Sequence, residues 1–215
     1  MRRLLFLILF GLLAYSGIAQ PVWKLKKVED GISIYTAHTE NSNYKSLKVE
    51  VTVSANINQL IAFLLDIEQQ PEWVYSTKLS HIVEVIAPNE LIFYSEANLP
   101  WPCSNRDYIA RFVINQPKPG HVTIDSRTDP DKLPRKKGLV RVPKSIAHWD
   151  ITSISNNEQK IVYTLHFDPG GVLPAWLVNL FLTKGPGYTF QHLRVGVLKP
   201  QYKDASFPFI STVHK

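Results

Sequence analysis

The middle of the chain is a run of strand-like segments joined by turn residues, and this pattern restricts the fold more than any other feature. Alternation of apolar and polar residues is typical of a half-buried strand, and it recurs from residue 80 to residue 167. The segments are Ser80–Ile86, Glu90–Ala97, Asp107–Ile114, His121–Ser126, Gly138–Val142, Ile146–Ser153 and Lys160–Phe167. Turn residues such as Pro88-Asn89 and Pro119-Gly120 separate them, which predicts a meander of antiparallel neighbours.

Two strands and a helix are predicted before this run. Apolar residues at 32 and 34 follow the turn signal Asp30-Gly31, and Leu47–Val53 alternates along its whole length. Ser54 and Asn56 are N-cap candidates for a helix. Its apolar residues are Leu60, Ile61, Phe63, Leu64 and Ile67. Pro71 either ends this helix or begins a second short one.

The last third of the chain changes to helical spacing. Pro174 occupies the expected first helical position, where the missing N–H costs nothing. Apolar residues then recur at helical intervals up to Val197. Gly185-Pro186-Gly187 interrupts them and predicts a kink or a break. Strands followed by a separate helix define the α+β class, with an antiparallel sheet.

Composition describes a single globular domain and excludes several functions. The 215 residues are 45% hydrophobic and 20% charged, too apolar for a disordered chain. The net charge of +6 permits contact with an anionic surface, but it is not concentrated enough to predict nucleic-acid binding. Cys103 is the single cysteine, so neither an intramolecular disulfide nor a cysteine-based metal site can form.

No motif in the sequence indicates catalysis. The seven histidines are scattered without metal-ligand spacing, which predicts no metal site and no cofactor. Cys103 and Ser104 lack the sequence context of a hydrolase nucleophile. The sequence therefore predicts that the protein is not an enzyme. The alternatives are an enzyme that acts on a bound hydrophobic substrate, such as a cyclase or hydrolase, and an interaction domain with a filled core.

Three segments resemble the START family, the steroidogenic-acute-regulatory-protein-related lipid-transfer domains. The first is Trp101-Pro102 followed by Asn105-Arg106-Asp107-Tyr108-Ile109, and the second pairs Val140-Arg141 with His148-Trp149. The third and most specific is the turn and helix start from Asp168-Pro169-Gly170-Gly171 to Asn179. The resemblance runs from about Trp23 to about Lys199, and we assign residues 20–215 to one START-like lipid-binding domain.

The resemblance implies a helix-grip fold, in which a curved antiparallel sheet wraps around the C-terminal helix and encloses a hydrophobic tunnel. The tunnel would hold one lipid-like ligand, such as a sterol, a phospholipid or a fatty acyl chain. Two alternating faces and the helix supply the expected ligand-binding residues. They are Phe93, Ser95, Ala97, Tyr108, Ala110, Phe112, Trp176, Leu180, Phe181 and Tyr188. The family's lid loop corresponds to residues 127–137.

Arg106 and Asp107 are neighbours on one predicted strand, so their side chains point to opposite faces. Either Arg106 binds a polar ligand head group or both residues serve turn and strand structure, and the second interpretation is favoured. The densest basic cluster, Lys132-Leu133-Pro134-Arg135-Lys136-Lys137, is either a solvated loop or a transient contact with a membrane surface. We expect a monomer.

The N-terminus has the order of a secretory signal peptide. Arg2 and Arg3 precede an apolar run up to Leu13, and the small residues Gly17 and Ala19 follow it. An uncleaved anchor is the alternative, but the strongly apolar part has only the length of a signal-peptide core. We therefore interpret residues 1–19 as a signal peptide and expect the protein to be exported, either periplasmic or secreted.

The signal peptide makes a direct prediction. The protein isolated from its native host should begin at or close to Gln20, because Gly17 and Ala19 provide the small side chains that the peptidase requires. Mass spectrometry of the intact chain measures this. A membrane-embedded product that retains Met1 contradicts it.

Overall fold

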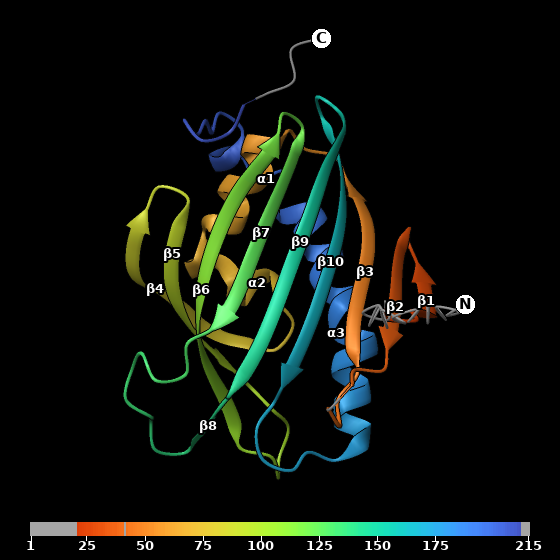
Figure 1. Ribbon diagram of the computed structural model, residues 1–215, viewed down its shortest axis with the longest axis vertical. Coiled ribbons are helices and arrows are strands. Elements are labelled where there is room, and N and C mark those ends of the chain that lie inside the picture. The colour runs from red at the N-terminus through yellow and green to blue at the C-terminus, as the bar shows by residue number, and fades with distance from the viewer. Residues whose placement is uncertain (1–20, 41, 212–215) are drawn as a thin grey trace, which may run out of the picture.

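The structure is a computed structural model that describes residues 21–40 and 42–211. The predicted signal peptide lies outside the described residues. The described part is an α+β fold in which ten strands form one large open sheet and the helices lie behind it (Figure 1). The α+β class and the helix-grip architecture that the resemblance implied are confirmed.

Nine of the ten strands follow one another along a single antiparallel path in the order β1-β2-β3-β10-β9-β7-β6-β5-β4. Their bounds are β1 Lys24–Glu29, β2 Ile32–Ala37, β3 Ser46–Val53, β4 Thr77–Ala87, β5 Glu90–Ala97, β6 Asn105–Lys118, β7 His121–Thr128, β9 Lys144–Ser155 and β10 Glu158–Asp168. Alternation predicted most of these strands, and β5 has the predicted bounds. The strand β1 was not predicted, because all six of its residues are exposed and it has no buried face to create an alternation.

The strand β8, Leu139–Arg141, departs from the predicted meander. It pairs in parallel with the start of β6, where Asn105 lies opposite Leu139, and it does not lie between β7 and β9. A buried ion pair explains this position, because the Arg141 side chain binds the Asp107 carboxylate across the two strands.

The N-terminal helices follow the predicted caps closely. Helix α1 runs from Ile57 to Leu65, and the Asn56 side chain accepts a hydrogen bond of 2.8 Å from the backbone N–H of Gln59. A 3-10 turn over Ile67–Gln69 leads into the short helix α2, Gln70–Trp73. Pro71 lies at the start of α2, where it needs no helical donor. A second 3-10 turn, Pro200–Tyr202, follows the C-terminal helix.

Helix α3 runs without interruption from Ala175 to Gly196, with Pro186 inside it, so the predicted break is wrong. Pro174 is the N-cap residue and not the first helical residue. Tight packing accounts for the continuity, because α3 lies against the chain that follows α2. A Cβ atom on Gly185 would come within 3.2 Å of the Tyr75 ring. Tertiary contacts thus outweigh the local preference of the Gly-Pro-Gly triplet.

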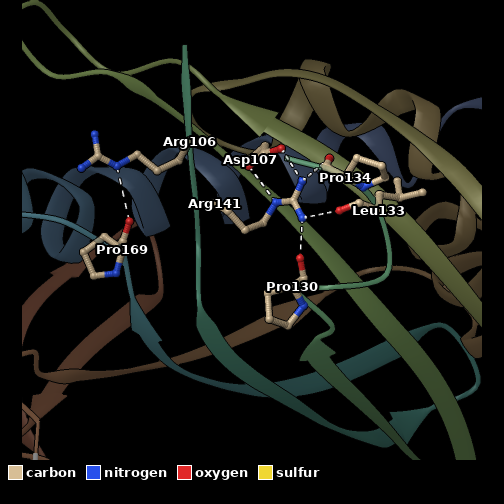
Figure 2. Close-up of polar contacts among 7 residues, drawn as sticks. All are labelled: Arg106, Asp107, Pro130, Leu133, Pro134, Arg141 and Pro169. Atoms are coloured by element: carbon tan, nitrogen blue, oxygen red, sulfur yellow. Dashed lines mark hydrogen bonds and ion pairs between the residues drawn. The ribbon is translucent and has the colours of Figure 1, made fainter. Parts of the chain in front are cut away.

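The ion pair between Asp107 and Arg141 is the most deeply buried charge pair of the described residues (Figure 2). Arg141 donates from Nε and Nη2 to the two carboxylate oxygens at 2.9 and 3.0 Å. Its remaining N–H groups bind the carbonyls of Pro130, Leu133 and Pro134. One side chain therefore joins β8, β6 and the loop between β7 and β8.

Loss of this pair should destabilise the fold strongly. Arg141→Met leaves the Asp107 carboxylate buried without a partner, which costs about 3–5 kcal/mol. Lys199→Met is the matched control, because its pair with Glu72 is exposed and should contribute less than about 1 kcal/mol. Urea unfolding measures both changes, and equal midpoints for the two variants would refute the assigned role.

Candidate functional site

A cavity of about 280 Å³ lies between the concave face of the sheet and the helices α2 and α3. This volume is close to the lower end of the range for small-molecule pockets, which is about 300–1,000 Å³. Its walls are mainly apolar and aromatic. Prominent side chains are Leu64, Trp73, Phe93, Phe112, Trp149 and Phe190. The space between the sheet and the helices is therefore not completely filled by side chains. This observation disfavours the alternative of an interaction domain with a filled core.

Five of the predicted binding residues line this cavity: Phe93, Ala97, Tyr108, Phe112 and Phe181. The pairing of β5 with β6 explains why four of them meet. Ser95 lies opposite Tyr108 and Ala97 lies opposite Arg106, so alternate residues of both strands share the concave face. The two alternating faces predicted on these strands therefore point into the same space.

Three other predicted residues lie outside the cavity wall. Ser95 and Ala110 are fully buried on the same face but do not line the cavity. Tyr188 is 39% exposed and stacks on His192.

The last two predicted residues are Trp176 and Leu180. Their backbone belongs to α3, and their side chains lie outside the described part of the structure.

The sequence analysis missed an aromatic cluster on β9, β10 and α3. The ring centroids of Trp149 and Tyr163 lie 4.6 Å apart, and each lies 5.6 Å from the ring centroid of Phe190. All three residues line the cavity. Alternation along β9 and β10 would have placed Trp149 and Tyr163 on one face. Only the pairing of the two strands shows that they are direct neighbours.

Arg106 and Asp107 have different roles. Asp107 points to the convex face and binds Arg141, whereas Arg106 lines the cavity and is 6% exposed (Figure 2). The guanidinium group of Arg106 donates to the carbonyls of Ser104, Pro169 and Gly170. Burial lowers its pKa below the ordinary value. The favoured structural interpretation thus holds for Asp107, whereas Arg106 both fixes the turn before α3 and forms part of the cavity wall.

The remaining polar groups of the cavity are uncharged. The described lining contains no Asp, Glu, His or Lys side chain. Burial raises the pKa of the Tyr108 and Tyr163 phenols, so both stay neutral at physiological pH. Neutral phenols can orient a ligand through hydrogen bonds, but they do not supply a base near neutral pH.

The loop that was expected to act as a lid packs elsewhere. Within residues 127–137, Leu133 contacts a small apolar cluster of Ile92, Tyr94 and Ile109 on the convex face of the sheet. Lys136 lies over the Tyr94 ring, and Lys132 pairs with Glu84. No described residue of this loop lines the cavity. The lid assignment is wrong for this conformation, because the Arg141 contacts hold the loop to the outer face.

Among the described residues, no group of three or more His, Cys, Asp or Glu side chains is arranged to hold a metal ion. Within the same residues, none of the helices combines the length and hydropathy needed to span a bilayer.

Comparison with known proteins agrees with this architecture. The START domain family model matches residues 12–200, and the chain belongs to this family.

Three relatives show the range of the similarity. An uncharacterized protein of Pseudomonas aeruginosa is 27% identical over 80% of this chain and 85% of its own. The human phosphatidylcholine transfer protein is 28% identical over 78% of this chain and 79% of its own. The crystal structure of a STAR-related lipid transfer protein from Xanthomonas axonopodis is 28% identical, with a TM-score of 0.75. It covers 81% of this chain and 98% of the other.

Filling part of the cavity should weaken ligand binding without unfolding the protein. Ala147 lines the cavity and lies opposite Ser126 and Leu165, which also line it. Ala147→Phe should lower lipid affinity by about tenfold or more, since losing about 60 Å² of apolar contact corresponds to roughly 1.5 kcal/mol. Native mass spectrometry after incubation with lipid vesicles measures the loading.

Ala205→Phe, in the turn that follows α3, is the control for this variant. It should load as the unmodified protein does. Unchanged loading of a folded Ala147→Phe variant contradicts the assignment of the cavity as the ligand site.

Proposed function

We propose that this protein binds one lipid in the cavity and transfers it between membranes. The observation that carries the proposal is an internal space with apolar walls that the surrounding side chains do not fill. A ligand there is held by burial of apolar surface, worth about 25 cal/mol per Å², and a few polar groups orient it. A sterol, a phospholipid and a fatty acyl lipid are all candidates.

We infer that the protein is not an enzyme. The alternative was a cyclase or hydrolase of the same broad fold, which needs a positioned acid or base. The described lining residues include no Asp, Glu, His or Lys that could serve as this acid or base. The one charged lining side chain, Arg106, donates hydrogen bonds to three backbone carbonyls. Turnover of a bound lipid by the purified protein would support the alternative instead.

The end of the molecule that holds the loop between β5 and β6 suits contact with a membrane. Trp101 in this loop is 90% exposed, and Val172 in the loop before α3 is 96% exposed. Leu99 and Leu173 of the same two loops line the cavity. The basic loop, residues 132–137, lies at this end of the molecule too (Figure 1). Exposed apolar side chains at the ends of loops, next to cationic side chains, favour a transient contact with an anionic lipid surface.

The place of action is inferred from the sequence. The signal-peptide pattern of residues 1–19 supports export to the periplasm or the medium. With Cys103 as its single cysteine, the exported chain depends on its core for stability and not on disulfides. We propose that it acts as a monomer.

Transfer should depend on Trp101 more than equilibrium binding does. Trp101→Ala removes an exposed side chain that would be buried in the lipid interface, and about 1.4 kcal/mol of membrane affinity corresponds to a tenfold change. Lipid transfer between vesicles should slow by about tenfold while ligand affinity stays unchanged.

The control is Val85→Ala on the edge strand β4, which is 66% exposed and far along the strand from the cavity. This variant should transfer normally. Equal rates for Trp101→Ala and the unmodified protein would refute the proposed contact.

A further inference from the structure

A second hollow lies on the convex face of the sheet, on the opposite side from the lipid cavity. It has a volume of about 460 Å³, within the range of small-molecule sites. Its walls include Pro21, Trp23, Ser46, Ile146, Thr164 and His166. The last four belong to the neighbouring strands β3, β9 and β10, where they alternate with residues that line the cavity. They therefore point to the other face of the sheet, and the hollow is a separate feature.

The floor of the hollow carries a chain of hydrogen bonds that ends at an imidazole. The hydroxyl oxygens of Thr39 and Ser46 lie 2.7 Å apart, and the Ser46 oxygen lies 3.3 Å from Nδ1 of His166. Nε2 of His166 and the hydroxyl group of Thr164 form no hydrogen bond with a described residue. When Thr39 donates to Ser46 and Ser46 donates to Nδ1, the neutral ring carries its proton on Nε2 and can donate it to a ligand.

The wall beside this floor is an aromatic side chain that neighbouring groups hold in place. Nζ of Lys48 lies 5.6 Å from the ring centroid of Trp23 and 4.2 Å from that of Tyr35. Lys48 is held in turn by an ion pair of 2.7 Å with Glu50. The indole ring thus gives the hollow an apolar wall next to a polar floor, against which the apolar part of a ligand can pack.

Two cationic side chains border the hollow on the same face. Arg127 of β7 lies directly opposite Ile146, and Lys144 precedes Ile146 by two residues on β9. Both are exposed, and neither side chain forms a hydrogen bond or an ion pair with a described residue. Burial and then the charge of Lys144 lower the pKa of His166 below its ordinary value, whereas Asp168 acts in the opposite direction. The charge of Lys144 thus reaches the floor of the hollow.

The acidic groups of this region already have partners. Asp125 binds Nδ1 of His148 at 2.9 Å, and Asp168 accepts from the backbone N–H of Gly170 at 2.8 Å. The carboxylate of Glu50 binds Lys48, as described above. An anion that enters the hollow therefore meets two cations that no described acid pairs, and charge-assisted hydrogen bonds are the strong ones.

We propose that this convex hollow is a second ligand site, which binds an organic anion with an apolar body. The phosphate or carboxylate group lies between Arg127, Lys144 and Nε2 of His166, and the apolar part packs against Trp23. Soluble anions and the head group of an anionic lipid present the same oxygen atoms, so both are sources of this chemistry. The site is independent of the proposed lipid cavity, because the sheet separates the two.

Phenyl phosphate tests the site because it carries both features, and inorganic phosphate and phenol carry one each. Imidazole signals in NMR spectra of the purified protein follow the binding. Phenyl phosphate should shift the His166 signal in a saturable way and bind about fivefold more tightly than either half, because only the whole probe uses the cations and the indole ring. The pKa of His166 should rise in the complex, since an anion beside the ring favours the imidazolium form.

Variants locate the bound anion. Arg127→Gln and Lys144→Gln should each weaken phenyl phosphate binding by about three- to fivefold, as expected for a partly exposed charge contact. Lys160→Gln is the matched control, because Lys160 is an exposed residue on the same face near the opposite end of β10. It should bind as the unmodified protein does. Trp23→Leu should lower the affinity for phenyl phosphate to that for inorganic phosphate.

Vesicles of phosphatidylcholine with phosphatidic acid test the lipid head group as the source. Sedimentation with these vesicles should fall in Lys144→Gln and also in His166→Leu if the head group occupies the site. The second change removes no charge from the neutral imidazole, so general attraction to the vesicle does not explain its effect. A saturable His166 shift with phenyl phosphate assigns a soluble anion instead.

The proposal fails if neither result is obtained. It also fails if phenyl phosphate binds equally well to the unmodified protein and to folded Arg127→Gln and Lys144→Gln. The His166 signal of the unmodified protein still decides for phenyl phosphate if a variant does not fold. Lipid uptake into the cavity is measured separately, so the proposed function does not depend on this outcome.

Discussion

The segments packed on the two faces of the sheet depend on two adjacent residues of β6 that face opposite ways. Asp107 points to the convex face, where its buried pair with Arg141 fixes β8 and the preceding loop. Arg106 points to the concave face, where it binds the carbonyls of Pro169 and Gly170 and so positions the start of α3. Because a strand alternates its side chains, one dipeptide connects the outer loop, the sheet and the helix that closes the cavity.

The cavity exists because large rings hold the helix away from the sheet. The cluster of Trp149, Tyr163 and Phe190 joins β9 and β10 to α3, and Tyr75 packs against α3 at Gly185. Such contacts fix the distance between the layers but leave space between them. An interior of this kind gives up some packing stability, because the atoms that line an empty space lose contact partners.

Polar groups are few in this space and differ in how they are satisfied. The Arg106 guanidinium group donates three hydrogen bonds to backbone carbonyls, and the phenols of Tyr108 and Tyr163 stay neutral because burial raises their pKa. Gln70 and Trp73 alone among the described lining side chains have buried polar atoms without partners.

The sequence by itself determined most of the strands, the faces of β5 and β6, and the cap of α1 at Asn56, because alternation and capping are local properties. Its local pattern did not determine where β8 lies, that α3 continues through Pro186, or that the loop around Leu133 packs outward. Contacts between distant segments decided these features. The tertiary packing also decided which side chains of a shared face reach the cavity, since Phe93 and Phe112 line it and Ser95 and Ala110 do not.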